Sequence, residues 1–270
     1  MARWRPAVGE FPCLTSTTLE LGEKNRPAGQ EAPIRDCVHS DALVASFLRT
    51  RSTDLELLDG EQLDPNELRT NLREMAMLNR LPGGVGDSVR AVDRLLDGKA
   101  DASVLDIGTG GGDFVRRLAR SRAAHVIAAD VSAEVVEIAR RNLADTKDVT
   151  VLQADVLALP LANAEVEVTH SSMLIHHLEP AEVVRALREM RRVARLGIVV
   201  NDLRRGPLAL AVTAATVLAL TRGAYTRHDG VLSARRAYTL PELDELATEA
   251  GLRAVWRTWS FWPRVTTVYR

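Results

Sequence analysis

The chain has 270 residues, 46% of them hydrophobic, so it can form one large or two small domains and has ample material for a core. Its 35 basic and 36 acidic side chains leave a formal net charge of -1. This balance argues against a global field that would draw the chain to nucleic acid or an anionic membrane, so we expect a small, roughly neutral ligand.

The cysteines argue against disulfide and zinc sites, and the apolar runs argue against a membrane span. Cys13 and Cys37 both lie near the N-terminus, which argues against a disulfide framework or a tetrahedral zinc site and suits a reducing, cytoplasmic environment. No apolar run reaches the ~18 residues that a membrane span needs. The nearest, residues 207–220 ("PLALAVTAATVLAL"), predicts a buried helix, with contact to a membrane or to an apolar ligand as the alternative.

The N-terminal part divides into an arm and a helical extension. Residues 1–38 mix proline, glycine and charges without a sustained period, which indicates a flexible arm. Apolar residues then recur every three or four positions in "DALVASFLRT", "DPNELRTNLREMAMLNRL" and "GDSVRAVDRLL". Asp64 and Pro65 supply an N-cap and a first-turn proline. We therefore expect residues 39–100 to form a helical cap.

From residue 101 onward, short apolar runs alternate with amphipathic helices. The expected strands are "SVLDIG", "HVIAAD", "VTVLQAD", "VEVTHSS" and "GIVVND", and the helices between them are "FVRRLARSR", "SAEVVEIARRNLA" and "PAEVVRALREMRRVAR". Strands separated by helices of this length form right-handed crossovers and a parallel sheet covered on both faces. The pattern predicts an α/β domain over residues 101–270.

An insertion interrupts this alternation at residues 203–238. It contains the apolar helix and then a polar stretch, "YTRHDGVLSARRAYT", which we expect to be a long loop over the mouth of the site. Thr239 and Pro241 begin a last helix, "TLPELDELATEAG", and two short runs follow it, "RAVWRTWSF" and "RVTTVYR".

Residues 104–114, "VLDIGTGGGDF", place four glycines in five positions directly behind a predicted strand. Glycine permits positive φ and lacks a Cβ, so a ligand can approach the backbone where the next helix presents free N–H groups. A P-loop is excluded because no Gly-Lys-Ser/Thr follows, and Asp113 breaks the G-x-G-x-x-G spacing of a dinucleotide site. The spacing fits G-x-G-x-G instead.

With the preceding acid included, the stretch from Asp106 to Gly112 resembles motif I of the class I S-adenosylmethionine-dependent methyltransferases. Three other features agree with this family. Asp130 ends the second strand, Asp155 follows the third, and "SSMLIHHLEP" resembles the segment after the fourth. The resemblance covers residues 102–200 well and the flanks loosely.

The resemblance implies a Rossmann-like, seven-stranded, mostly parallel sheet with helices on both faces. It also implies S-adenosylmethionine as cofactor and S-adenosylhomocysteine as product, with Asp130 on the ribose hydroxyls and Asp155 on the adenine amino group. The cofactor-binding residues that it implies are Asp106, Gly108, Thr109, Gly110, Gly112, Asp130, Val131, Asp155, Val156 and Ser171.

Two observations leave alternatives open. Each strand-end acid could be a structural residue that only caps the next helix. Val166-Glu167 stands where the family often has Phe-Asp, so the start of the fourth strand is uncertain.

A sulfonium methyl group is already activated, so the protein has to align the nucleophile, exclude water and accept a proton from a hydroxyl nucleophile. Histidine suits the last task. His170, His176 and His177 follow the fourth strand, and the candidate bases are His228, His177 and His176. His228, beside an acid in the predicted loop, is the first choice; a structural role is the alternative for each. Asn201-Asp202 could bind substrate or a metal, but no carboxylate cluster has convincing ligand spacing, so we expect no metal site.

Residues 207–220 and "LREMAMLNRLPGG" could roof the site with apolar side chains, which favours an apolar acceptor, although ordinary helix packing explains them equally. The helical extension and the "RHDG" segment also resemble small bacterial methyltransferases of secondary metabolism, including antibiotic, phenolic-lipid and quinone pathways. That likeness implies O-methylation of a phenol or related hydroxyl on a polyketide-, terpenoid- or quinone-like scaffold. C- or N-methylation uses the same fold and is the alternative.

The same residues argue against three other classes of protein. A non-catalytic binding or regulatory protein need not keep both the glycine turn and Asp130, and an NAD-dependent oxidoreductase needs the spacing that Asp113 breaks. The balanced charge and the lack of an Asn/Asp-Pro-Pro-Tyr/Phe segment argue against a nucleic-acid methyltransferase. We expect no nucleic-acid partner, and the sequence allows a homodimer.

Overall fold

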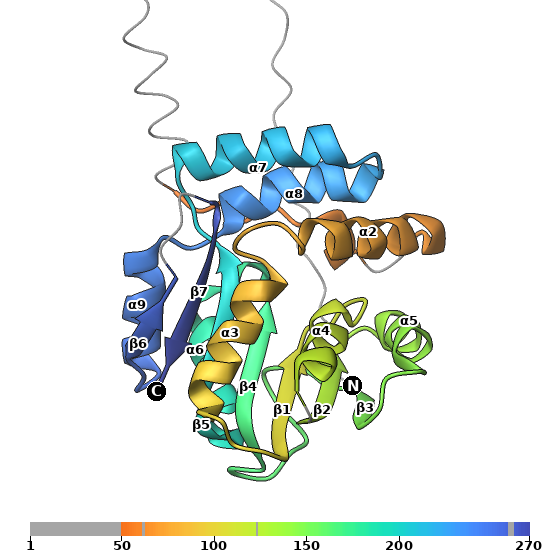
Figure 1. Cartoon of the computed structure of the whole chain (residues 1–270). Coiled ribbons are helices and arrows are strands. Elements are labelled where there is room, and N and C mark those ends of the chain that lie inside the picture. The colour runs from red at the N-terminus through yellow and green to blue at the C-terminus, as the bar shows by residue number, and fades with distance from the viewer. Residues whose placement is uncertain (1–49, 61–62, 123, 259–261) are drawn as a thin grey trace, which may run out of the picture.

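The computed structural model describes residues 50–60, 63–122, 124–258 and 262–270, which are arranged around one seven-stranded sheet (Figure 1). The strand order is β3-β2-β1-β4-β5-β7-β6. The strands are β1 (Ala102–Ile107), β2 (Ala124–Asp130), β3 (Val149–Gln153), β4 (Val166–Ser172), β5 (Ala194–Leu203), β6 (Ala254–Arg257) and β7 (Arg264–Tyr269). The first five are parallel, whereas β7 is antiparallel to both of its neighbours. The predicted α/β sheet is therefore confirmed.

Helices cover both faces and one end of this sheet. They are α2 (Pro65–Leu78), α3 (Val85–Leu96), α4 (Asp113–Ser121), α5 (Ala133–Leu143), α6 (Pro180–Val193), α7 (Pro207–Leu220), α8 (Ala224–Arg236) and α9 (Leu240–Glu249), with the short 3-10 helices η1 (Leu57–Asp59) and η2 (Ile175–His177). α3, α4 and α5 pack on one face of the sheet, and α6 and α9 pack on the other.

Alternation along β1 shows why the sheet needs both layers. Val104 belongs to the core under α3 and α4, whereas Leu105 and Ile107 belong to the core under α6. Successive strand side chains point to opposite faces, so a strand of consecutive apolar residues is stable only when helices cover both faces. β1 consequently lies at the centre of the sheet, with β2 and β4 as neighbours.

Most predicted elements are confirmed. The five parallel strands, the helices between them, the apolar helix at 207–220, the last helix and the two final strands all form. β4 begins at Val166, which settles the start of that strand. Within the helical extension α2 and α3 form, but residues 51–56 are not helical. The arm at 1–38 and all but the last residue of the predicted helix at 41–50 lie outside the described residues.

The predicted loop after α7 is wrong, because residues 224–236 form helix α8. Its buried positions include Thr226, Asp229, Ser233 and Arg236, which recur at helical spacing but are polar. A search for apolar periodicity therefore passes over this helix. Gly230 allows α8 to pack closely on α7, since a Cβ there would lie 2.9 Å from a methyl group of Val217.

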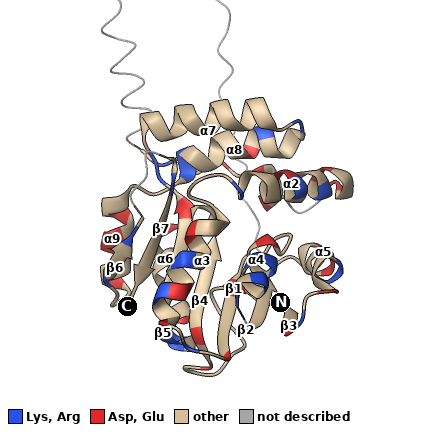
Figure 2. Ribbon diagram, viewed as in Figure 1, with Lys and Arg blue, Asp and Glu red and all other residues tan. Residues whose placement is uncertain are grey.

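Helices α2, α7 and α8 lie across the end of the sheet where the parallel strands terminate (Figure 1). α7 carries no charged residue, whereas both signs of charge are interspersed over α2 and α5 in the view of Figure 2. Among the helices that the structure describes, none is long and apolar enough to cross a membrane.

A buried carboxylate joins three strands at the opposite end of the sheet. Glu167, near the start of β4, accepts hydrogen bonds from the backbone N–H of Ser103 at 2.8 Å and from its hydroxyl at 2.5 Å. Lys99 and Arg195 also donate to it, at 3.0 and 2.6 Å. Burial alone would raise the pKa of Glu167, but these hydrogen bonds outweigh burial and lower the pKa to about 2.

Glu167→Gln should lower the free energy of unfolding at neutral pH by about 2 kcal/mol, since a hydrogen bond to a charged group contributes about 1.5–3 kcal/mol. The folded-state pKa of Glu167 lies below its ordinary value of 4.5, so this stabilisation is complete above pH 4.5 and is lost as the pH falls toward 2. Urea unfolding at neutral pH and near pH ~3 measures both effects, and the difference between wild type and variant should shrink in acid.

Glu245→Gln, on the exposed side of α9, is the matched control and should leave stability unchanged at both pH values. A wild-type advantage over Glu167→Gln that stays constant with pH would show that the charge of Glu167 does not stabilise the fold.

Candidate functional site

A cavity of about 370 Å³ lies at the carboxyl ends of β1 and β4. The strand order reverses at this point. β1, β2 and β3 follow one another toward one edge of the sheet, whereas β4 lies on the other side of β1. Ligands of open α/β sheets bind at such switch points. The lining comes from the turn after β1, from the segments that follow β2, β3 and β4, and from η1, α2 and α8.

The glycine turn exposes its backbone to this cavity. Gly108, Gly110 and Gly111 line it, and Gly110 has a φ of +52°. Gly112, with a φ of +79°, is the N-cap of α4, and a Cβ on it would lie 2.8 Å from Leu143. Bare backbone beside the N-terminus of a helix favours an anionic group of a ligand.

The three strand-end acids, Asp106, Asp130 and Asp155, face the cavity and also accept hydrogen bonds from nearby residues. Asp130 accepts hydrogen bonds from the backbone N–H groups of Gly110 and Ser132, both at 3.1 Å, and burial raises its pKa. Asp155 accepts from the N–H of Leu157 at 2.8 Å. Both acids therefore shape the local backbone, as a capping residue does, while their cavity-facing position leaves them able to meet a ligand.

Asp106, at the end of β1, is bound on both of its carboxylate oxygens. One accepts from the hydroxyl of Thr109 at 2.8 Å, and the other lies 2.7 Å from Nδ1 of His170 on β4. The His170 ring stacks on Phe114 at 3.7 Å between centroids, and its Nε2 lies 2.9 Å from the hydroxyl of Ser88. The turn is thereby fixed to the neighbouring strand and to α3.

The same network continues to the antiparallel edge of the sheet. Asn201 on β5 donates to the hydroxyl of Ser88 at 2.9 Å and accepts from Nε of Arg264 on β7 at 3.0 Å. Arg264 also donates to Asn79, whose amide donates to Asp113 at 2.9 Å. Ser88, Asn201 and Arg264 are buried, and the groups of this network satisfy one another, which makes the arrangement rigid.

Most of the predicted cofactor residues line the cavity. Those that do are Asp106, Gly108, Thr109, Gly110, Asp130, Val131, Asp155 and Val156. Gly112 and Ser171 are not among the lining residues. Ser171 is buried in β4, and its hydroxyl has no hydrogen-bond partner within the described ranges. The next residue, Ser172, lines the cavity because successive strand residues face opposite sides.

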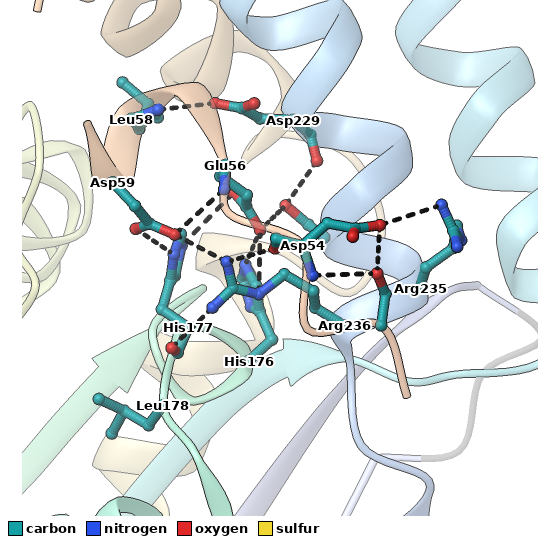
Figure 3. A network of polar contacts seen from close by, with 12 residues as sticks. Asp54, Glu56, Leu58, Asp59, His176, His177, Leu178, Asp229, Arg235 and Arg236 are labelled. Carbon is teal, nitrogen blue, oxygen red and sulfur yellow. Dashed lines mark hydrogen bonds and ion pairs between the residues drawn. The ribbon is translucent and has the colours of Figure 1, made fainter. Parts of the chain in front are cut away.

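A second group of polar side chains lines the other part of the cavity (Figure 3). His176 and His177 of η2 face Glu56, which precedes η1. Nδ1 of His176 lies 2.6 Å from Asp202, and Nδ1 of His177 lies 3.0 Å from Asp59. The two Nε2 atoms lie 3.7 and 3.8 Å from the Glu56 oxygens.

Two arginines fasten the segment around Glu56 to this end of the sheet. Arg236 of α8 donates to Asp59 at 2.7 Å and to the carbonyl of His177 at 2.8 Å. Arg51 donates to the carbonyl oxygens of His176 and Arg236, at 2.9 and 2.7 Å. These bonds tie residues 51–59 to both η2 and α8 and thereby place Glu56 in the cavity wall.

α8 supplies the remaining contacts of the cluster. Asp229 accepts from the backbone N–H groups of Leu57 and Leu58, at 2.8 and 3.1 Å, and so caps η1. The hydroxyl of Ser233 donates to Glu56 at 3.0 Å.

The carboxylates of the cluster differ in their charge. Burial raises the pKa of Glu56 to about 7. Burial acts in the same direction on Asp59, but the hydrogen bond and charge of His177, together with Arg236, outweigh it and lower the pKa to about 2. For Asp202 the charge of His176 similarly outweighs burial and lowers the pKa. Asp59 and Asp202 are therefore ionised at neutral pH.

The three predicted base candidates separate in space. His176 and His177 line the cavity, whereas His228 does not. His228 lies on α8 instead of a loop, its side chain is 53% exposed, and it contacts Asp229 at 2.8 Å. Asp229 itself faces inward, since adjacent residues of a helix do not share a face.

No motif in the sequence marks Glu56, Asp59 or the inward face of α8 as part of the site. Glu56 and Asp59 belong to a short acidic stretch with no motif, and their partners lie more than 100 positions away, 118 for the contact of Asp59 with His177. Asn201 and Asp202, singled out at the end of β5, do not line the cavity. They act through Ser88 and His176 instead.

Comparison with known proteins agrees with this geometry. Residues 104–197 match the family model described as a methyltransferase domain. That segment contains the glycine turn, the three strand-end acids and the histidine pair.

Three curated relatives match part of the chain. An uncharacterised 37.1 kDa protein of a Streptomyces fradiae transposon is 32% identical over 160 residues, 58% of this chain and 45% of that protein. A ubiquinone/menaquinone biosynthesis C-methyltransferase of Hahella chejuensis is 31% identical over 37% of this chain and 41% of its own. A malonyl-[acyl-carrier protein] O-methyltransferase of Enterobacter lignolyticus is 32% identical over 61% of this chain and 60% of its own. The chain spans about half the length of these relatives.

A solved structure shares the fold. The crystal structure of an S-adenosylmethionine-dependent methyltransferase from Aquifex aeolicus superposes with a TM-score of 0.54 at 20% identity, covering 77% of this chain and 98% of that one.

Proposed function

We propose that this chain, in which residues 104–197 match a methyltransferase domain, is a class I S-adenosylmethionine-dependent methyltransferase that methylates a hydroxyl group of a largely apolar small molecule. One observation carries the proposal. A single cavity joins the glycine turn and strand-end acids of a cofactor site to the His176–His177 pair.

The cofactor would occupy the part of the cavity beside β1, β2 and β3. The bare backbone of the glycine turn and the N-terminus of α4 suit the cofactor's carboxylate. Asp130 would bind the two ribose hydroxyls, and Asp155 would bind the adenine amino group. Val131 and Val156 would pack against the adenine ring.

The acceptor would occupy the part of the cavity beneath α2 and α8. Apolar side chains dominate that part of the lining: Leu63, Leu68, Leu72, Met75, Val85, Met173, Leu174 and Leu178. A smaller cavity of about 70 Å³ adjoins it and shares Met75, Met173, Thr226 and Gly230 with it. A flat or elongated apolar scaffold with one polar group fits this combination, and residues 203–238 would cover it.

Methyl transfer needs an oxygen nucleophile in line with the sulfonium methyl group. The acceptor oxygen forms a bond to the methyl carbon while the carbon–sulfur bond breaks, and the electron pair stays on sulfur. The proton of the hydroxyl has to leave, and the cluster of Glu56, His176 and His177 is where the cavity offers groups for this step. α2 and α8 line this part of the cavity and would limit the access of water to the reacting groups.

The groups that could take a proton from an acceptor hydroxyl, Glu56, His176 and His177, favour O-methylation. O-methylation is also the activity named for the Enterobacter lignolyticus relative. C-methylation is the second candidate, because the Hahella chejuensis relative is named a C-methyltransferase.

Four further expectations stay predictions from the sequence. They are a role in antibiotic, phenolic-lipid or quinone biosynthesis, a cytoplasmic location, a homodimer and the absence of a nucleic-acid partner.

Asp130→Ala should weaken S-adenosylmethionine binding by about 1–3 kcal/mol, through the loss of the two ribose hydrogen bonds. Calorimetric titration measures the affinity, and Asp145→Ala, an exposed acid after α5, is the control that should bind as wild type does. Unchanged affinity in a folded Asp130→Ala protein would remove Asp130 from the site.

His177→Ala should lower turnover by about 10²-fold and leave cofactor affinity unchanged, the range expected when a group that handles the acceptor proton is lost. The assay follows transfer of a labelled methyl group to phenolic and quinol acceptors. His125→Ala, on the exposed side of β2, is the matched histidine control. A loss in His228→Ala with none in His177→Ala would contradict the assignment and return the proton transfer to α8.

A further inference from the structure

Glu56, His176 and His177 form a cluster whose arrangement goes beyond a set of free bases. Each residue offers one ligating atom, and these atoms lie within 4.8 Å of one another. Over the ranges that the structure describes, no other group of three or more histidine, cysteine, aspartate or glutamate side chains meets this condition. Glu56 and His176 are almost completely buried.

The second nitrogen of each imidazole is already committed. Nδ1 of His176 is held by Asp202, and Nδ1 of His177 is held by Asp59, so in the neutral rings the proton sits on Nδ1. Each Nε2 then carries a lone pair that faces Glu56 (Figure 3). A carboxylate behind a histidine, fixing its tautomer and orientation, is the usual support of a metal-binding histidine.

The distances inside the cluster suit an ion better than direct hydrogen bonds. The two Nε2 atoms lie 3.7 and 3.8 Å from oxygens of Glu56, beyond hydrogen-bond range. Two ligands that each lie about 2.1 Å from a tetrahedral ion are about 3.4 Å apart. The three ligating atoms, one from each residue, lie within 4.8 Å of one another, so the side chains would have to close by up to about 1.4 Å around such an ion.

The charge of the surroundings also favours a cation. Glu56, Asp59, Asp202 and Asp229 all border the cluster, and Arg236 is the cation within ion-pair distance of Glu56 and Asp59. Asp59 and Asp202 are ionised at neutral pH, and metal binding requires neutral imidazoles. A bound divalent ion would therefore supply the positive charge that protonated imidazoles otherwise give to these two carboxylates.

We infer that Glu56, His176 and His177 bind a divalent first-row transition-metal ion, whose open coordination position receives the hydroxyl oxygen of the acceptor. Two imidazoles and one carboxylate suit Zn²⁺, Co²⁺, Ni²⁺ or Fe²⁺ better than Mg²⁺ or Ca²⁺, which prefer oxygen ligands alone. Three protein ligands with a free position are typical of ions that take part in a reaction.

The role in methyl transfer rests on the proposed function. A bound divalent ion lowers the pKa of coordinated water, so its open position would hold a hydroxide ion. When the acceptor binds, its O–H bond breaks, its oxygen replaces the hydroxide on the ion, and the hydroxide takes the proton and leaves as water. The oxygen then attacks the methyl carbon of the sulfonium, and the carbon–sulfur electron pair stays on sulfur. The sequence predicts no metal site because Glu56 is distant from the two histidines along the chain and approaches them only in the folded structure.

The test is a calorimetric titration of the full chain, after treatment with a chelator, with Zn²⁺ and Co²⁺, and with Mg²⁺ for comparison. We expect one Zn²⁺ or Co²⁺ per chain at this site and no comparable binding of Mg²⁺. Glu56→Gln and His177→Gln should each weaken binding by at least about tenfold, and Asp59→Asn should weaken it by about 10–100-fold through the support of His177.

His125→Gln and Glu245→Gln are the matched controls and should bind the ion as wild type does. The absorption spectrum of the Co²⁺ form adds a readout of the ligands, since cysteine ligation gives an intense charge-transfer band that histidine and carboxylate ligands lack. The proposal is overturned if neither ion binds, if the cluster variants bind as wild type does, or if the band shows cysteine ligands.

These measurements contain neither cofactor nor acceptor, so the two proposals can fail separately. If Zn²⁺ binds at the cluster but S-adenosylmethionine does not bind, the metal site stands and the methyltransferase function fails. If methyl transfer proceeds at full rate in a metal-free protein, the function stands and the catalytic role of the ion is overturned.

Discussion

The hydrogen bond between Asp106 and His170 holds together the part of the molecule on which the site depends. It joins the ends of β1 and β4 at 2.7 Å, with His170 fully buried, at the point where the strand order reverses. A buried carboxylate is costly unless its oxygens are paired, and here the imidazole and Thr109 satisfy both of them. The turn that follows can therefore present bare glycine backbone to the cavity without losing its place.

A second constraint operates from the covering layer. Segment 50–60 has little regular structure of its own, and its position comes from Arg51, Arg236 and Asp229, which bind backbone and side-chain groups across to η2 and α8. Because Glu56 and Asp59 reach the histidine pair only through these bonds, the end of the cavity that we propose for the acceptor depends on contacts between segments that are distant in sequence. The end beside the glycine turn also depends on one distant contact, from Asp106 to His170, but the turns that line it follow directly from the ends of β1, β2 and β3.

This difference explains how much the sequence could predict. The strands, the helices between them and the glycine turn follow from local periodicity and backbone requirements, and all of them were predictable. α8 was not, because Thr226, Asp229, Ser233 and Arg236 bury polar atoms, and hydropathy gives no signal for a polar buried face. His228 was preferred as a base because it adjoins Asp229. That pairing exists, but the helix turns Asp229 inward and His228 outward. Glu56 could be found only once the chain was folded.

The identity of the cofactor is the premise of the proposed function. A calorimetric titration of the purified chain with S-adenosylmethionine, with NAD as the comparison, tests it without knowledge of the acceptor. We expect micromolar binding of S-adenosylmethionine and no binding of NAD, because the G-x-G-x-G turn and the strand-end acids suit the first ligand and Asp113 breaks the spacing required for the second. Binding of NAD, or binding of neither compound, would contradict it.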